Sequence, residues 1–258
     1  MSESSIPGST GGQHPLAGLI DHNETYGSHL IRSFVADIPS VGTAIDIGAG
    51  SGRDLATVKA VHPQARTIAI EAGREYARAL EDKVDEVHVL NIERDPFPFA
   101  DGSIDVVIAN QILEHTKEVF WIFHQVARVL APGGHFIFGV PNVLSAHNRL
   151  LALLGRHPTQ HKLYSAHVRP FSRRDTVAFL EVCSPGTFAV EHFSGSQFYP
   201  FPRAIARPLS RLLPNMAFSI FFSIKKVGPY ADGFVKLPGA AGLETNFFVG
   251  DSGDRGQY

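Results

Sequence analysis

Several features are scarce in this chain of 258 residues, and each scarcity excludes a class of protein. The single cysteine, Cys183, excludes an internal disulfide and fits a reducing compartment. A formal net charge of −2 gives no global positive field, so we expect no nucleic-acid partner. No apolar run reaches the roughly 20 residues that a membrane-spanning helix needs. Residues 1–15 are rich in Ser and Gly and lack the apolar core of a secretory signal, so we expect a cytoplasmic protein.

The most informative residues form a glycine-rich loop directly after an apolar strand. Between Thr43 and Asp54 the chain reads Thr-Ala-Ile-Asp-Ile-Gly-Ala-Gly-Ser-Gly-Arg-Asp, with Gly48, Gly50 and Gly52 at alternate positions. Because glycines lack Cβ atoms, such a loop can turn sharply and let a cofactor approach the backbone and the start of the next helix. The pattern therefore predicts a nucleotide-binding loop.

Two features of this loop argue against a dinucleotide. A G-x-G-x-x-G fingerprint would need its third glycine at position 53, which is Arg53. The carboxylate of Asp46 would repel a pyrophosphate but would attract a cofactor that carries an ammonium and a sulfonium. S-adenosylmethionine is such a cofactor, and a nicotinamide oxidoreductase becomes the less favoured interpretation.

Polar residues after the next strands extend the predicted site. Glu71 ends the apolar run 66–71 and can accept hydrogen bonds from both ribose hydroxyls of an adenosine. Asn91 and Ile92 follow the run 86–90 and could hold the edge and the face of an adenine. The predicted cofactor-binding residues are Asp46, Gly48, Ala49, Gly50, Gly52, Glu71, Ala72, Asn91, Ile92, Asn110 and Gln111.

Strand and helix patterns alternate from residue 43 onward, which predicts an α/β protein with a doubly wound parallel sheet. The expected strands are 43–48, 66–71, 86–90, 104–109 and 135–140, and the expected helices are 52–61, 73–82 and 116–130. Ligands bind such sheets outside the carboxyl ends of the strands. Asp46, Glu71, Asn91 and Asn110 all lie at those ends.

Taken in order, these motifs resemble the class I S-adenosylmethionine-dependent methyltransferases, in the small-molecule branch that includes ubiquinone-type O-methyltransferases. The matching positions are 46–52, Glu71, Asn91, 97–105, 112–115 and 127–134, within a resemblance that is dense over 40–142 and loose over 165–227. The resemblance implies a Rossmann-like, seven-stranded, mostly parallel sheet with an antiparallel last strand. Its last two strands would be 187–193 and 217–224. It also implies methyl transfer to a small-molecule, sugar or lipid-linked acceptor, with oxygen as the favoured atom.

The expected organisation is a disordered lead over 1–15, one methyltransferase domain over 16–227 and a C-terminal tail over 228–258. Within the domain we expect a core over 40–142 and a lid or acceptor region over 142–171. A helical arm over 16–38 would cover the cofactor cleft, with Tyr26 and His29 as cleft residues. A further helix over 172–182 would be capped by Ser172.

Methyl transfer from a sulfonium depends mainly on positioning the acceptor, and it needs a protein base only when the acceptor is weakly acidic. His167 is the preferred candidate for this base and His115 is the second. For each of them a structural role is the competing interpretation.

No metal is expected from the sequence. Some relatives in the resembled branch hold a divalent cation with an acid-x-x-Glu-His set, but the first position here is Gln111. Glu114 and His115 alone make a poor site for a hard cation, which needs several oxygen ligands.

Residues 198–222 combine apolar side chains with Arg203, Arg207 and Arg211, which recur every four residues. One interpretation is a helix that covers the sheet edge with its arginines in solvent. The other is a peripheral contact with a membrane surface or with a lipid-linked anionic acceptor.

One alternative function remains open at this point. A non-catalytic S-adenosylmethionine-binding protein would have the same cofactor residues. Detection of S-adenosylhomocysteine after incubation with an acceptor pool would separate the two functions.

Overall fold

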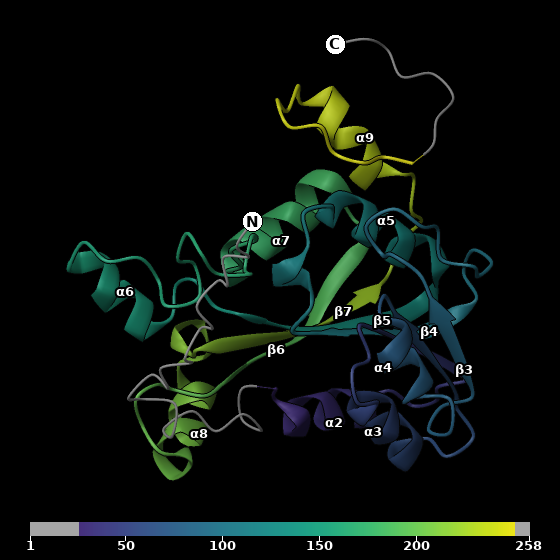
Figure 1. The fold of residues 1–258 in the computed structure, drawn as a ribbon, viewed down its shortest axis with the longest axis horizontal. Coiled ribbons are helices and arrows are strands. Elements are labelled where there is room, and N and C mark those ends of the chain that lie inside the picture. The colour runs from purple at the N-terminus through teal and green to yellow at the C-terminus, as the bar shows by residue number, and fades with distance from the viewer. Residues whose placement is uncertain (1–25, 251–258) are drawn as a thin grey trace, which may run out of the picture.

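A seven-stranded sheet runs through the middle of the molecule, with helices packed against both of its faces (Figure 1). The structure is a computed structural model, and it describes residues 26–250. The strand order is β3-β2-β1-β4-β5-β7-β6. The expectations for residues 1–15, for the first part of the N-terminal arm and for 251–258 lie outside the described residues.

The sheet is parallel except for its last strand. The strands are β1 (Thr43–Ile47), β2 (Arg66–Glu71), β3 (Glu86–Val89), β4 (Ile104–Asn110), β5 (Leu130–Pro141), β6 (Phe188–Ser196) and β7 (Ser219–Lys226). Strands β1 to β5 pair in parallel, whereas β7 runs antiparallel to both β5 and β6. This confirms the expected seven-stranded, mostly parallel sheet with an antiparallel last strand.

Helices cover the two faces of the sheet in separate groups. They are α2 (Ser28–Ala36), α3 (Arg53–Val61), α4 (Arg74–Arg78), α5 (Val119–Val129), α6 (Ala146–Leu153), α7 (Arg173–Cys183), α8 (Arg203–Leu212) and α9 (Gly233–Ala240), with short 3₁₀ helices η2 (Leu113–His115) and η3 (Pro214–Met216). Helices α2 and α3 pack on one face, and α5, α7 and α9 lie over the other (Figure 1). Within residues 26–250, the structure contains no helix with the length and hydrophobicity that a membrane span requires.

The central strands are apolar on both sides because helices cover both faces of the sheet. In β1, Ile45 and Ile47 contribute to the core on the α5 side, and Ala44 to the core on the α2 side. Val107 and Val106 of β4 alternate in the same way. This double burial explains the near-continuous apolar runs of the sequence.

The two expected boundaries that differ most from the structure are the start of β5 and the end of α4. Strand β5 begins at Leu130 rather than at 135, because Leu130 pairs with Ile104 before the register shifts. Helix α4 is shorter than the expected 73–82, because the N–H groups of Leu80 and Lys83 bond three residues back in tight turns. The expected cap of the helix predicted over 172–182 is confirmed in α7, since the Ser172 hydroxyl accepts a hydrogen bond from the Asp175 N–H.

The segment expected as a C-terminal tail contains helix α9. Phe234 of α9 is fully buried, with its ring centroid 5.5 Å from that of Phe123 in α5 and 5.3 Å from that of Phe179 in α7. Pro238 and the glycines of this segment disfavour a helix locally. Aromatic packing against α5 and α7 therefore stabilises an element that local propensity does not predict.

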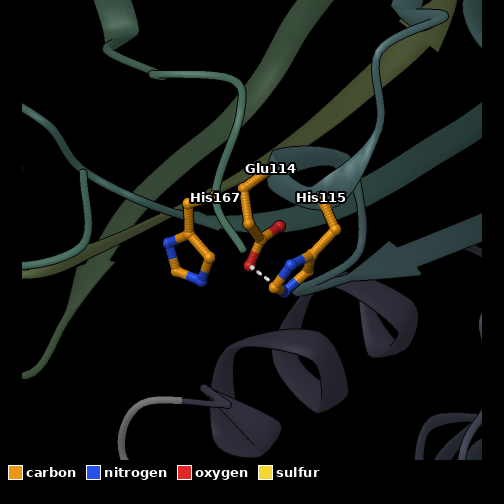
Figure 2. Close-up of side chains that lie close together, drawn as sticks. All are labelled: Glu114, His115 and His167. Carbon is orange, nitrogen blue, oxygen red and sulfur yellow. Dashed lines mark ion pairs between the residues drawn. The ribbon is translucent and has the colours of Figure 1, made fainter. Parts of the chain in front are cut away.

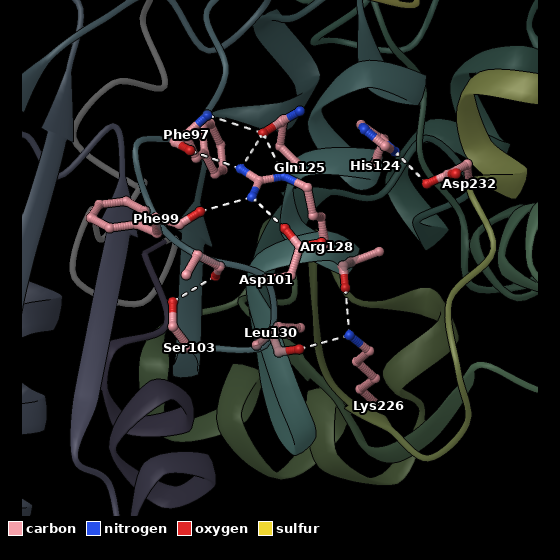
Figure 3. A network of polar contacts seen from close by, with 12 residues as sticks. Phe97, Phe99, Asp101, Ser103, His124, Gln125, Arg128, Leu130, Lys226 and Asp232 are labelled. Atoms are coloured by element: carbon pink, nitrogen blue, oxygen red, sulfur yellow. Dashed lines mark hydrogen bonds and ion pairs between the residues drawn. The ribbon is translucent and has the colours of Figure 1, made fainter.

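Two basic side chains, Arg128 and Lys226, form hydrogen bonds at the carboxyl end of α5 (Figure 3). The Arg128 guanidinium donates to the carbonyl oxygens of Phe97 and Phe99, each at 2.7 Å, and pairs with Asp101 at 2.7 Å. Lys226 of β7 is buried, and its Nζ donates to the carbonyl oxygens of Ala127 and Leu130 at 2.7 Å. These carbonyls at the end of a helix have no intrahelical donor. Arg128 therefore connects α5 to the loop after β3, and Lys226 connects α5 to β7.

We expect Lys226→Met to destabilise the fold by about 1–3 kcal/mol, because it leaves two buried carbonyl oxygens without a donor. The neighbouring Lys225→Met is the matched control, since Lys225 makes only an exposed ion pair with Glu191 at 3.4 Å. Urea unfolding followed by circular dichroism measures both. Equal shifts of the two midpoints would show that the carbonyl contacts of Lys226 contribute nothing to stability.

Candidate active site

The loop between β1 and α3 is built from glycines in the left-handed conformation. Gly48, Gly50 and Gly52 have φ angles of 70°, 55° and 79°. A Cβ atom at Gly48 would lie 3.0 Å from Cγ1 of Ile112, so the backbone approaches this neighbour too closely for a side chain. Gly52 is the N-cap residue of α3. The loop therefore presents bare backbone and the first N–H groups of α3 at the carboxyl edge of the sheet.

Glu71 lies against this loop. Strands β1 and β2 are parallel neighbours, so their carboxyl ends meet, and Oε1 of Glu71 accepts a hydrogen bond from the Gly50 N–H. The predicted ribose acceptor and the predicted glycine loop thus belong to one site, although they are 21 residues apart in the chain.

Two further carboxylates are buried behind the loop. Asp46 is 3% exposed and Asp54 is 7% exposed. Burial raises the pKa of Asp46 well above its usual range, and the negative charges of Asp54 and Glu71 raise it further. Burial also raises the pKa of Asp54, while a hydrogen bond from Asn110 and the charge of Arg53 lower it. Within residues 26–250 neither Asp46 nor Glu71 pairs with a Lys or Arg, so the site favours a positively charged ligand.

Asp54 is a site residue that the sequence reasoning missed. It stands in the first turn of α3, where an acid is ordinary because it favours the helix N-terminus. The feature of the sequence that could have identified Asp54 is its position eight residues after Asp46, just beyond the glycine loop. Only the fold shows that the two carboxylates are close enough to affect each other's pKa.

The end of β4 joins the loop to the N-terminal helical segment. Nδ2 of Asn110 donates to Oδ2 of Asp54 at 2.8 Å and to the carbonyl oxygen of Tyr26 at 2.9 Å. Gln111 follows with φ of 57°, and its Nε2 is buried without a hydrogen-bond partner. Left-handed backbone at a non-glycine residue is strained and is frequent at ligand sites. Tyr26, predicted as a cleft residue, therefore lies beside the predicted cofactor residue Asn110.

Asn91 and Ile92 lie near Glu71, because the N–H of Leu90 donates to the carbonyl oxygen of Glu71 at 3.0 Å. The Asn91 side-chain oxygen accepts from the N–H of Glu93 at 3.0 Å and closes a local turn. Ile92 packs against the hydrophobic core. The amide NH₂ group and the second lone pair of this oxygen are the atoms of Asn91 that would contact an adenine edge.

Glu114, His115 and His167 form a cluster at the same edge of the sheet (Figure 2). The ring centroids of His115 and His167 are 4.6 Å apart, and Nε2 of His115 lies 3.9 Å from Oε1 of Glu114. The segment expected as a lid is held here because the N–H groups of Val168 and Arg169 donate to the carbonyl oxygen of Glu114 at 2.8 and 3.1 Å. The structure thus brings the two predicted base candidates together.

Burial controls the acid–base properties of this cluster. It raises the pKa of Glu114 to about 7. Burial, together with the positive charges of His115 and His161, lowers the pKa of His167 to about 4. His167 is therefore neutral at pH 7 and is a weaker base than a free imidazole. Glu114 is 1% exposed with Oε2 unpartnered, and the sequence reasoning did not consider it as a base because its burial is a tertiary property.

The same three side chains are the residues that could hold a metal. Their ligand atoms lie within 4.8 Å of one another, and no other such group of three occurs in the part of the chain that the structure describes. Two imidazoles and one carboxylate suit a transition metal such as zinc better than magnesium. The sequence reasoning weighed only Glu114 and His115, because the fold alone brings His167 to them.

The comparisons with known proteins agree with this geometry. A methyltransferase domain model matches residues 45–138, which extend from β1 into β5 and include the glycine loop, Glu71 and Glu114. A probable S-adenosylmethionine-dependent methyltransferase of Mycolicibacterium smegmatis is 29% identical over 135 residues, 51% of each protein. The thiol S-methyltransferase TMT1A of Homo sapiens is 32% identical over 101 residues, 36% of this chain and 40% of that protein.

The chain spans between 30% and 51% of the length of the curated relatives that it matches. Among solved structures, a putative methyltransferase in complex with the Haloferax volcanii Trm112 methyltransferase activator has a TM-score of 0.57 at 17% identity. That alignment covers 81% of this chain and 93% of the other. At this low sequence identity, the likeness between the two proteins shows a shared fold only. Residues 45–138 therefore match a methyltransferase domain, and the seven-stranded sheet around them has the fold of solved S-adenosylmethionine-dependent methyltransferases.

Proposed function

We propose that this protein binds S-adenosylmethionine at the β1–α3 loop and transfers its methyl group to an acceptor held at the Glu114 cluster. The observation that carries the proposal is the set of three carboxylates around the glycine loop, Asp46, Asp54 and Glu71. Burial raises the pKa of Asp46, and the negative charges of Asp54 and Glu71 raise it further. A ligand with an ammonium and a sulfonium would relieve the repulsion among the three carboxylates.

The proposed reaction is an in-line displacement at the activated methyl carbon. The acceptor atom forms a bond to the methyl group, the bond from carbon to sulfur breaks, and S-adenosylhomocysteine leaves. A hydroxyl or thiol acceptor also loses a proton, which His167, His115 or Glu114 would accept. Positioning of the two reactants supplies most of the rate enhancement.

We propose a small-molecule, sugar or lipid-linked acceptor, with oxygen as the favoured methylated atom. The support is the position of the cluster, which lies between the strand ends and the expected lid region 142–171. A thiol acceptor is the second candidate, because the relative from Homo sapiens is named as a thiol methyltransferase. The cytoplasmic location remains an expectation from the sequence.

The direct test is incubation with S-adenosylmethionine and a pool of hydroxyl and thiol acceptors, followed by mass spectrometry. Formation of S-adenosylhomocysteine together with a methylated product would support the enzyme. Tight cofactor binding without either product, across the whole pool, would favour the non-catalytic cofactor-binding alternative.

Glu71→Ala should weaken S-adenosylmethionine binding by about ten- to a hundredfold. Hydrogen bonds to a carboxylate contribute roughly 1.5–3 kcal/mol, and the variant removes the proposed ribose acceptor. Isothermal titration calorimetry measures the dissociation constant, with the exposed Glu81→Ala as control. An unchanged dissociation constant in a folded Glu71→Ala protein would remove this assignment.

His167→Gln should depress turnover and leave cofactor affinity nearly unchanged, because the side chain would act on the acceptor proton only. His157→Gln is the control, since His157 is an exposed histidine of the same lid region. Turnover is followed as S-adenosylhomocysteine release, and affinity by calorimetry. Parallel loss of both quantities would indicate a structural role, and full activity would eliminate His167 as the base.

Methyl transfer should persist after treatment with a chelator, because the sulfonium carbon needs no Lewis acid for displacement. S-adenosylhomocysteine release before and after the treatment measures this. If activity disappears and added zinc restores it, the expectation of no metal is wrong and Glu114, His115 and His167 are its ligands.

A further inference from the structure

Exposed apolar side chains are concentrated in two segments of the described chain. Of the 19 large hydrophobic side chains that are exposed, 12 lie within 144–168 and 201–216. The most exposed include Leu153 at 84%, Leu163 at 103% and Leu212 at 77%. We call the exposed side chains of these two segments the α6–α8 surface. Such clustering is unusual, because exposed apolar residues are normally scattered singly.

Helices α6 and α8 bury small or polar residues and expose large apolar ones. In α8 the buried positions are the small residues Ala206 and Ser210, while Ile205 and Leu212 are exposed. In α6 the buried residue is the polar Asn148, and Leu153 is exposed. An amphipathic helix that only covers a core buries its large apolar side chains and exposes its polar ones. The apolar faces of α6 and α8 are therefore directed away from the protein.

The two segments of this surface contain basic residues and no acidic residue. No Asp or Glu occurs from Val119 to Arg174 or from His192 to Ala231, although the whole chain has a net charge of −2. Within the two segments of the α6–α8 surface the cations are Arg149, Arg156, Lys162, Arg203, Arg207 and Arg211. Two copies of this surface would repel each other, so a second copy of the chain is a poor occupant.

The two segments lie together at one end of the molecule. Helices α6 and α8 both project from the left of the sheet, away from β3 (Figure 1). The ring of His147 in α6 is 4.6 Å from that of Tyr199, which precedes α8. Nδ2 of Asn142 donates to the carbonyl oxygen of Asn215 at 2.9 Å. The apolar and cationic side chains thus belong to connected parts of the molecule.

A cavity beside α6 adds a site for anionic groups. Its volume is about 570 Å³, and Arg149, Arg173 and Arg174 line it. Guanidinium groups match the geometry of phosphate oxygens. The cavity can therefore receive a phosphate group at the base of the α6–α8 surface.

We propose that the α6–α8 surface binds the surface of an anionic lipid bilayer. Leucines at the tips of the surface would enter the boundary of the acyl chains, and Arg149, Arg156 and Arg211 would contact lipid phosphates. The sequence alone suggested such a contact for 198–222, and the structure adds α6, the 157–168 loop and the arginine-lined cavity. The binding does not depend on the proposed methyl transfer.

Vesicle flotation at low and high salt tests the proposal, with neutral phosphatidylcholine vesicles and vesicles containing phosphatidylserine. The wild-type protein should float with the anionic vesicles, and high salt should weaken the binding. The double variant Leu153→Ser and Leu212→Ser should weaken binding by about tenfold or more, because it removes two apolar anchors. Both side chains are exposed, so thermal unfolding should be unchanged.

A matched control is Tyr76→Ser, which removes an exposed aromatic side chain at 63% exposure outside the α6–α8 surface. Binding that falls equally in the control and the double variant would overturn the assignment of the surface. Failure of the wild-type protein to bind any vesicle would overturn the proposal itself. Sedimentation equilibrium of the same samples would then show whether a second copy covers the surface.

Discussion

The arrangement of this molecule depends on strand β1, which is hydrogen-bonded in parallel to β2 on one side and to β4 on the other. Parallel pairing brings the carboxyl ends of the three strands to one edge of the sheet. Asp46, Glu71 and Asn110 therefore lie around one glycine loop although they are distant in the chain. Any shift of register along β1 would separate them.

That edge is electrostatically unfavourable in the absence of a cation. Burial raises the pKa of Asp46, Asp54 and Glu114, so each of these carboxylates is disfavoured as an ion. A structure selected for stability alone would place apolar or paired residues there. Unpaired carboxylates beside a bare backbone loop are instead suited to a ligand that supplies the missing positive charge.

The opposite imbalance holds at the α6–α8 surface, where cations and leucines face outward and acids are absent over long stretches. The acidic edge of the sheet and the basic surface are connected by the segment between α6 and α7, which carries His167. Their proximity would let one molecule hold a soluble cofactor on one side and an interfacial acceptor on the other.

The sequence by itself determined the alternating fold, the glycine loop and the acids at the strand ends, because these depend on local apolar runs, on glycine spacing and on position after such a run. Tertiary structure alone decided the rest. Asp54 is close enough to Asp46 to raise its pKa, and His167 lies beside Glu114 and His115. Phe234 stabilises α9 by packing against Phe123, which is distant in the chain. Burial and charge interaction depend on distances in space, and a one-dimensional pattern does not contain those distances.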